Sequence, residues 1–187
     1  MPKILKDVDI YQAVIRVVTE RGYAGATTKQ MAEAADVSEV TLFRKYGSKP
    51  QLVKQAIAAI VEQTSIGAAA DFTGDVVADL IRIVRKYSDS AVHHGQFFMI
   101  LLSEMRRYPE MTELVDAPYG VFQGFAQLLK RYQQEGILRT EHPLHALAAL
   151  LGPVIYTSLI RRAFPEADVP PLDLENHVGS FLEGRRI

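Results

Sequence analysis

The 187-residue chain contains no cysteine. This absence excludes disulfide bonds, thiolate metal sites and cysteine nucleophiles. Three patterns that carry enzyme chemistry are also missing: a glycine-rich phosphate loop, a G-x-S-x-G nucleophile elbow and an H-E-x-x-H metal motif. We therefore expect no catalytic site, no metal and no cofactor.

Histidine is scarce as well, but two of the five histidines suggest an alternative. His142 and His145 lie three positions apart and Glu141 adjoins them, so three side chains of metal-ligating type are close in sequence. Pro143 stands between the two histidines and makes a regular helix face there unfavourable. Metal binding is therefore the weaker interpretation of this cluster.

Long apolar runs are few. None approaches the eighteen or so residues of a membrane span, and the first residues, MPKILKDVD, lack the apolar core of a signal peptide. The chain is 48% hydrophobic and 23% charged, which is ordinary for a soluble protein. We therefore expect a cytoplasmic protein that does not bind a membrane.

The formal net charge of −1 hides an uneven distribution. Residues 1–63 hold nine Lys or Arg and seven Asp or Glu, whereas residues 64–187 hold twelve and fifteen. A basic patch is the expected footprint of phosphate binding, although this excess is small. The clustering of Arg44, Lys45 and Lys49 within six positions is more informative.

The stretch between residues 27 and 49 predicts two short helices around a tight turn. Thr27 followed by Gln30 fits a capping box at the start of the first helix. Ser38 can cap the second helix and Gly47 can end it. Such a pair is a helix-turn-helix, whose second helix typically enters the DNA major groove. The same pattern also fits an ordinary corner between two helices.

Several short elements follow one another in a fixed order between Ile10 and Leu52. They are Arg21-Gly22-Tyr23, Thr27-Thr28, Met31-Ala32-Glu33-Ala34-Ala35, Val37-Ser38, Thr41-Leu42-Phe43, Tyr46 and Ser48-Lys49. In this order they resemble the DNA-binding domain of the tetracycline-repressor (TetR) family of transcriptional regulators. The resemblance covers about a quarter of the chain. Two positions differ from the usual pattern of that family, because Phe43 stands where tyrosine is most common and Tyr46 where phenylalanine is common.

The resemblance implies an all-α fold with two domains. Residues 1–66 would form a three-helix DNA-binding domain with a linking helix at about 49–66, and residues 67–187 a larger helical domain for ligand binding and dimerisation. Apolar periodicity and helix breakers predict further helices at 9–21, 75–92, 97–108, 110–115, 118–135, 143–164 and 172–182. We expect a loop at 67–74, a break at His93-His94-Gly95, a segment 97–108 that is buried all round, and a kink at Pro153.

Nine residues are candidates for contact with DNA. At the start of the first short helix, the hydroxyl of Thr28 can meet a phosphate, and Lys29 lies beside it. The other candidates lie on or just after the second helix and are Glu39, Val40, Thr41, Phe43, Arg44, Lys45 and Lys49. For each of the nine, the alternative is a solvated surface side chain.

The seven later candidates differ in the contacts that they can make. Glu39, Val40 and Thr41 lie nearest the base edges, where Thr41 can hydrogen-bond a base and Val40 offers only apolar contact. Phe43 can pack on sugar or on a thymine methyl, and Arg44 can read guanine or clamp a phosphate. The two lysines, Lys45 and Lys49, suit phosphate contacts.

Two long late helices and an aromatic-rich segment point to further partners. The faces of 118–135 and 143–164 carry small and apolar residues, and the resemblance implies a homodimer through them; alternatively, they complete the monomer core. The resemblance also implies a small-molecule effector in the second domain. Candidate ligand contacts are Phe98, Met105, Phe125 and Tyr156, although aromatic stripes are more often core.

These observations predict a sequence-specific DNA-binding regulator. The most consistent form is a homodimeric repressor that binds a near-palindromic double-stranded operator and is released by a small molecule. Two alternatives stay open at this point: an activator of the same family, and a helical adaptor that binds protein.

Overall fold

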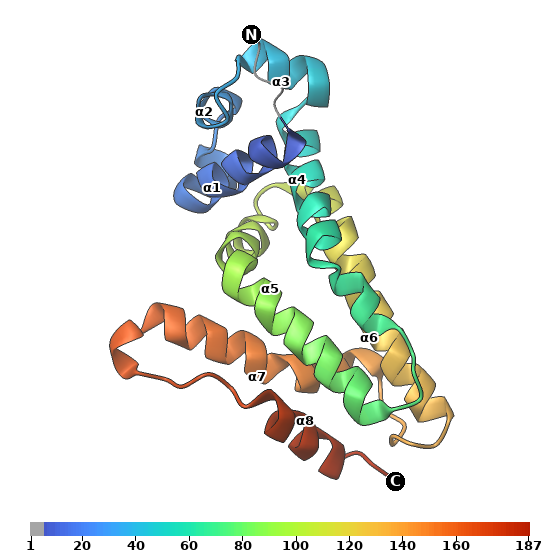
Figure 1. The fold of residues 1–187 in the computed structure, drawn as a ribbon. Helices are drawn as coiled ribbons and strands as arrows, with labels where there is room; N and C mark the ends of the chain where they lie inside the picture. The colour runs from blue at the N-terminus through green and yellow to red at the C-terminus, as the bar shows by residue number, and fades with distance from the viewer. Residues whose placement is uncertain (1–5) are drawn as a thin grey trace. The chain divides into compact units, whose positions relative to one another are not determined.

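A computed structural model describes residues 6–187 and is drawn in Figure 1. Its elements are α1 (Asp7–Gly25), α2 (Thr28–Ala34), α3 (Glu39–Tyr46), α4 (Lys49–Thr64), η1 (Ile66–Ala70), α5 (Val76–Glu104), η2 (Pro109–Val115), α6 (Asp116–Gln134), α7 (Pro143–Ala163), η3 (Pro165–Ala167) and α8 (Leu174–Glu183), where η marks a 3-10 helix. Over residues 6–187 no strand occurs, although Leu138 and Arg186 form an isolated antiparallel bridge. The predicted all-α fold class is confirmed.

Helix α5 runs through the break that the sequence predicted. It extends without interruption from Val76 to Glu104, so the expectation of a break at His93–Gly95 was wrong. A glycine inside a helix costs only about 1 kcal/mol relative to alanine. Fully buried side chains on both sides of Gly95, such as Val84 and Leu101, stabilise the continuous helix by more than that.

Other boundaries also differ from the prediction. Helix α1 begins at Asp7 rather than at residue 9, and the expected loop 67–74 contains most of the 3-10 helix η1. The segment 97–108 is not buried all round, because Met99 and Leu102 are 44% and 55% exposed. Helix α7 includes Pro153, as predicted, whereas the kink expected there stays a prediction.

The chain divides into two compact units that are discontinuous in sequence. The first unit holds the described residues up to Gln63 together with His94–Tyr119, and the second holds Thr64–His93 with Gly120–Ile187. Helix α5 belongs to both, since it begins in the second unit and ends in the first. The domain boundary at residues 66 and 67 stays a prediction.

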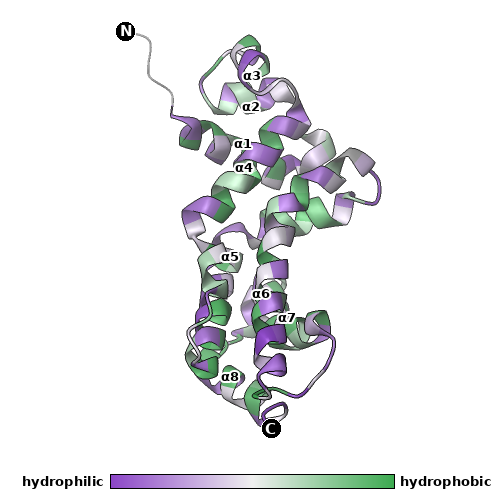
Figure 2. Cartoon of the chain, turned by 90° about the vertical axis from the view of Figure 1, so that its right-hand side faces the viewer, coloured by the Kyte–Doolittle hydropathy of each residue, from purple (hydrophilic) through white to green (hydrophobic). Residues whose placement is uncertain are grey.

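One apolar core holds the first unit together. The apolar stripe of α1 is buried there, with exposures of 5% or less: Ile10, Ala13, Val14, Val17 and Val18. The end of α5 and the 3-10 helix η2 add Phe97, Leu101, Met111 and Leu114 to the same cluster. Figure 2 shows that apolar and polar stretches alternate along these helices, as expected for helices with one buried face. The helix-turn-helix segment therefore shares its core with the last turns of α5.

Gly22 marks a joint within this unit. Its backbone has φ 73° and ψ 165°, which interrupts α1. The carboxylate of Glu104, at the end of α5, accepts a hydrogen bond from the backbone N–H of Ala24 at 3.0 Å. A Cβ atom at position 22 would lie 2.5 Å from the other carboxylate oxygen of Glu104. The absence of a side chain therefore lets α5 approach the interrupted helix closely.

A buried carboxylate organises the second unit. Asp79 has no exposed surface and accepts hydrogen bonds from the backbone N–H and hydroxyl of Thr73 and from the hydroxyl of Tyr132, at 2.9, 2.6 and 2.5 Å. Arg82 forms an ion pair with it at 3.0 Å. Burial alone would raise the pKa of Asp79, but these hydrogen bonds and the Arg82 charge lower it overall. The ionised carboxylate thus joins the segment before α5 to α5 and α6.

Helix α7 is more apolar than we predicted from the sequence. Its 21 residues are long and apolar enough to cross a membrane, so the expectation that no run approaches that length was wrong. A single helix of this kind is weak evidence for a span, because core helices of soluble proteins meet the same criteria. Several of its apolar side chains are exposed, namely Leu144, Ile155, Tyr156 and Leu159.

We predict that Gly22→Ala destabilises the protein by about 1–3 kcal/mol, because alanine is strained at positive φ and its methyl group would displace Glu104. Gly25→Ala is the matched control: it lies in the same helix, has no positive φ, and its Cβ would meet only the Cβ of Arg21 at 3.6 Å. We expect this control to be neutral or stabilising. Urea unfolding followed by circular dichroism compares the two variants. Equal free energies of unfolding would contradict the requirement for glycine at position 22.

We predict that Tyr132→Phe lowers the free energy of unfolding by about 1–3 kcal/mol at pH 7, because Asp79 loses a buried donor. The pKa of Asp79 lies below its unfolded value. The stabilisation is therefore complete above the unfolded pKa of about 3.9 and is lost as the pH falls through the folded value. The difference between wild type and variant should shrink below about pH 4.

The matched control for this substitution is Tyr119→Phe, at a side chain that is 56% exposed. Its effect should stay within about 0.5 kcal/mol. Urea titrations at pH 7 and pH 3 measure both variants. A cost for Tyr132→Phe that equals that of the control at pH 7 would show that the Asp79 network does not stabilise the second unit.

Candidate nucleic-acid interface

Helices α2 and α3 form the helix pair that the sequence predicted. At the start of α2, the hydroxyl of Thr27 accepts a hydrogen bond from the backbone N–H of Gln30 at 3.2 Å. The side-chain oxygen of Gln30 accepts one from the backbone N–H of Thr27 at 3.0 Å. This reciprocal pair completes the predicted capping box and fixes the first turn of α2.

The turn between the helices is equally well defined. Asp36 has φ 57°, and the backbone N–H of Val37 bonds to the carbonyl of Ala32 at 3.0 Å. Val37 packs against the core of the first unit. Ser38 caps α3 as predicted, since its hydroxyl accepts from the backbone N–H of Thr41 at 3.2 Å. These contacts set the direction in which α3 leaves the turn.

Helix α3 has one buried face and one exposed face. Leu42 and Tyr46 lie four residues apart, on one side of the helix, and face the core with exposures of 2% and 5%. Val40 and Phe43 face solvent with exposures of 74% and 49%. Val40 and Phe43 lie three positions apart, so their exposed side chains are neighbours on the outer face of α3. The side chain of Arg44 is also exposed, and no hydrogen bond or ion pair joins it to a described residue.

A hydrogen bond joins the starts of the two helices. The hydroxyl of Thr28 donates to the carboxylate of Glu39 at 2.5 Å. The hydroxyl of Thr41 likewise lies 2.8 Å from that of Ser38. Two of the hydroxyls predicted to contact DNA are therefore already engaged within the chain, whereas Lys29 is exposed.

The two lysines predicted to contact phosphates also have partners in the chain. The ammonium group of Lys45 forms an ion pair with Asp7, which lies in the first turn of α1. The ammonium group of Lys49 donates a hydrogen bond to the backbone carbonyl of Tyr23 and lies 4.3 Å from the centroid of the Tyr23 ring. Asp7 was missed by the sequence reasoning, and the DNA-contact roles of both lysines stay predictions.

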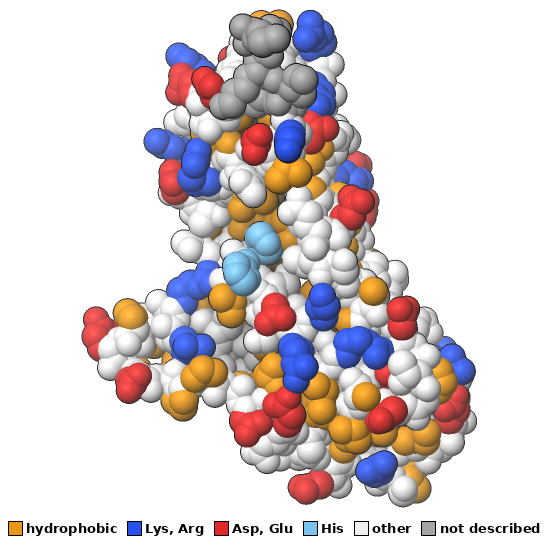
Figure 3. Space-filling model, in the orientation of Figure 1, with side chains coloured by type: hydrophobic (Ala, Val, Ile, Leu, Met, Phe, Trp, Pro, Cys, Tyr) orange, Lys and Arg blue, Asp and Glu red, His pale blue; other side chains and the backbone are white. Residues whose placement is uncertain are grey.

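One carboxylate oxygen of Asp7 accepts two hydrogen bonds. Its Oδ1 atom accepts from Lys45 and, at 3.1 Å, from the hydroxyl of Tyr46. The hydrogen bond from Lys45 is the main cause that lowers the pKa of Asp7, so the carboxylate is ionised at neutral pH. Burial is the main cause that raises the pKa of Tyr46, and this keeps its hydroxyl protonated. On the face drawn in Figure 3, Lys and Arg side chains are interspersed with Asp and Glu side chains.

The four candidate ligand contacts are distributed over both units. Phe98 and Met105 pack against the core of the first unit. In the second unit, Phe125 is fully buried, whereas Tyr156 is 64% exposed. Within neither unit does the structure bring all four together, and their role in ligand binding stays a prediction.

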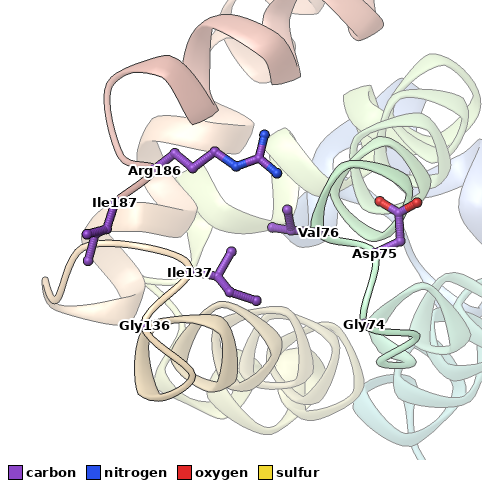
Figure 4. A pocket seen from close by; sticks show the side chains of 7 residues that line it. All are labelled: Gly74, Asp75, Val76, Gly136, Ile137, Arg186 and Ile187. Atoms are coloured by element: carbon purple, nitrogen blue, oxygen red, sulfur yellow. The ribbon is translucent and has the colours of Figure 1, made fainter.

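A pocket of about 460 Å³ lies in the second unit, and none of the four candidates lines it. Figure 4 shows its lining residues, which are Gly74, Asp75, Val76, Gly136, Ile137, Arg186 and Ile187. Asp75 accepts hydrogen bonds from the backbone N–H groups of Val77 and Ala78, both at 3.0 Å, and so caps α5. Its carboxylate is therefore already used in the fold.

His142 has a role in secondary structure. Its Nδ1 atom accepts a hydrogen bond from the backbone N–H of Leu144 at 3.3 Å, which caps α7. The His145 ring lies 5.1 Å from the His142 ring, between centroids. Over residues 6–187, no group of three or more His, Asp or Glu side chains is arranged to hold a metal ion.

Comparison with known proteins adds to this geometry. The family described as bacterial regulatory proteins of the tetR family matches residues 10–56. The uncharacterized HTH-type transcriptional regulator YvkB of Bacillus subtilis (strain 168) is 27% identical over 139 residues, which cover 70% of this chain and 69% of the relative. An uncharacterized HTH-type transcriptional regulator of Mycobacterium tuberculosis is 24% identical over 168 residues, covering 87% of this chain and 81% of the relative.

Solved structures share the fold over nearly the whole chain. A candidate fatty acid metabolism regulator from Clostridium perfringens has a TM-score of 0.76 at 19% identity and covers 96% of this chain and 99% of its own. The transcriptional regulator FadR from Bacillus subtilis, solved in complex with stearoyl-CoA, has a TM-score of 0.72 at 16% identity and covers 95% and 96%. At these identities the likeness establishes the fold alone.

Proposed function

Because the chain belongs to the TetR family of transcriptional regulators, we propose that it is a repressor that binds a near-palindromic operator as a homodimer and is released by a small molecule. The observation that supports this most is the geometry of α3. Its inner side chains and its Ser38 cap fix the helix, while Val40, Phe43 and Arg44 stand exposed on its outer side. We place the protein in the cytoplasm, where its DNA would be.

In this proposal the exposed side chains of α3 read the bases. Val40 and Phe43 have no hydrogen-bonding group, so they suit thymine methyl groups or sugar. Arg44 suits the O6 and N7 atoms of guanine or a phosphate, and Glu39 can accept from the N4 amino group of cytosine. Phosphate contacts would come from the start of α2, at Thr28 and Lys29, and from Lys45 and Lys49.

A homodimer would supply the second half of the binding site. One short recognition helix reaches only a few base pairs, and two-fold dimers read two half-sites roughly one helical turn apart. The exposed apolar side chains of α7, Ile155, Tyr156 and Leu159 among them, suit burial against a second copy. The buried side chains of α6, by contrast, belong to the core of the second unit. We therefore assign the larger part of the proposed dimer surface to α7, with α6 beside it.

Helix α5 offers a route for release by a ligand. It passes from the second unit into the first, where Glu104 holds the backbone of Ala24. A ligand that favours a different position of α5 would disturb this contact and so disfavour the DNA-binding arrangement of α1 to α3. The relative solved with stearoyl-CoA suggests a largely apolar acyl compound as the first class to test.

The proposal predicts that purified protein enriches an inverted repeat from random double-stranded DNA. The two half-sites should lie about 10 base pairs apart, centre to centre, because each recognition helix enters a major groove on the same side of the duplex. Sequencing of the bound fraction in the presence of competitor nucleic acid measures this. Enrichment of a single, non-repeated site would contradict the dimer, and retention of no sequence would favour a helical adaptor that binds protein.

The proposal also predicts that one class of small molecule both stabilises the protein and weakens operator binding. Fatty acids and acyl-CoA thioesters of graded chain length are the test set, and shorter acyl chains serve as matched controls. Thermal unfolding and fluorescence anisotropy of labelled operator give the two measurements. A compound that raises the melting temperature without changing operator affinity would show binding uncoupled from release.

A further inference from the structure

We propose that Asp7 sets the affinity for the operator by competing with a DNA phosphate for the ammonium group of Lys45. This inference rests on the proposed DNA-binding function and concerns a residue that lies outside the family match at residues 10–56. Asp7 lies on α1, outside the helix-turn-helix, yet its carboxylate forms an ion pair with Lys45 at the end of α3.

The geometry places the acid at the end of α3. Lys45 and Tyr46 are the last two residues of that helix, and both donate to the same carboxylate oxygen of Asp7. The Asp7 and Lys45 side chains are 45% and 44% exposed. Ion pairs that are this exposed to water are weak, so a phosphate oxygen can displace the carboxylate.

A carboxylate and a phosphate offer a lysine the same kind of partner. The ammonium group is a point charge with three rotatable donors, and it binds either oxyanion without a preferred plane. While Asp7 holds Lys45, the pair approaches DNA with no net charge. Lys45 can then neutralise a phosphate only after the ion pair opens. The freed carboxylate of Asp7 still repels the phosphates of the DNA backbone nearby. Both effects lower the affinity of the resting protein for DNA.

The negative charge of Asp7 can be removed without loss of its hydrogen bond from Tyr46. Its ring is buried and lies 6.0 Å from the ring of Tyr11, between centroids, so its position depends on core packing. Asparagine at position 7 keeps an oxygen that can accept from the Tyr46 hydroxyl, but it carries no charge. The substitution Asp7→Asn therefore removes the competition and leaves the anchoring of α3 in place.

The experiment measures binding of full-length variants to a labelled duplex carrying the enriched inverted repeat, by fluorescence anisotropy between 50 and 300 mM salt. We expect Asp7→Asn to bind about 3- to 10-fold more tightly at low salt. Its plot of log K against log salt should be steeper by about 0.9 for each protomer, since the charge of Lys45 is then no longer offset by a carboxylate. Asp7→Glu keeps the charge and should bind like the wild type.

Two controls isolate the contact. Asp9→Asn removes the same charge from the same turn of α1, and Asp9 has no hydrogen bond or ion pair with a described side chain. This variant therefore measures only the effect of one negative charge on DNA affinity at long range. Lys45→Ala removes the cation itself. In the Lys45→Ala background, Asp7→Asn should have no more effect than Asp9→Asn.

Several outcomes would overturn the inference. Weaker binding by Asp7→Asn would mean that Asp7 orients Lys45 toward DNA. An effect equal to that of Asp9→Asn would mean that Asp7 acts only through the net charge of the protein. A gain that persists in the Lys45→Ala background would remove Lys45 from the mechanism. These results leave DNA binding intact. A wild-type protein that binds no duplex even at 50 mM salt would contradict the proposed function itself and, with it, this inference.

Discussion

The presentation of α3 depends on the burial of two of its side chains. A helix of eight residues is too short to be stable alone in water, so its shape must come from its surroundings. Leu42 and Tyr46 supply that support from its inner face, and Ser38 and Gly47 define its ends. Because the inner face is fixed, the exposed outer face can be presented to a partner in one orientation.

The core that buries these side chains is not made by the helix-turn-helix alone. The last turns of α5 and the 3-10 helix η2 complete it, and Glu104 satisfies a backbone donor beside Gly22. The same α5 begins in the second unit, next to the buried Asp79 network. A single continuous helix thus contributes side chains to both cores. The two units are therefore joined through the backbone of α5.

Local features of this fold could be predicted from the sequence, and features that depend on distant residues could not. The capping box at Thr27 and the cap at Ser38 involve groups three residues apart, so their spacing was enough. The continuity of α5 through Gly95 was missed, because burial on either side outweighs a weak local signal. Asp7 was missed because its partner Lys45 is 38 residues away. Aromatic residues such as Phe98 and Phe125 carry no local signal that separates core from ligand contacts.

The most direct test of base reading by the outer face of α3 is an altered-specificity selection. Wild type and Val40→Asn would be selected side by side against random duplex DNA, with Val92→Asn, at an exposed position of α5, as the control. Because asparagine pairs with the N6 and N7 atoms of adenine, we predict that Val40→Asn changes the preferred base at one position in each half-site, toward adenine. The control should select the wild-type sequence. An identical sequence selected by all three proteins would contradict base reading by Val40.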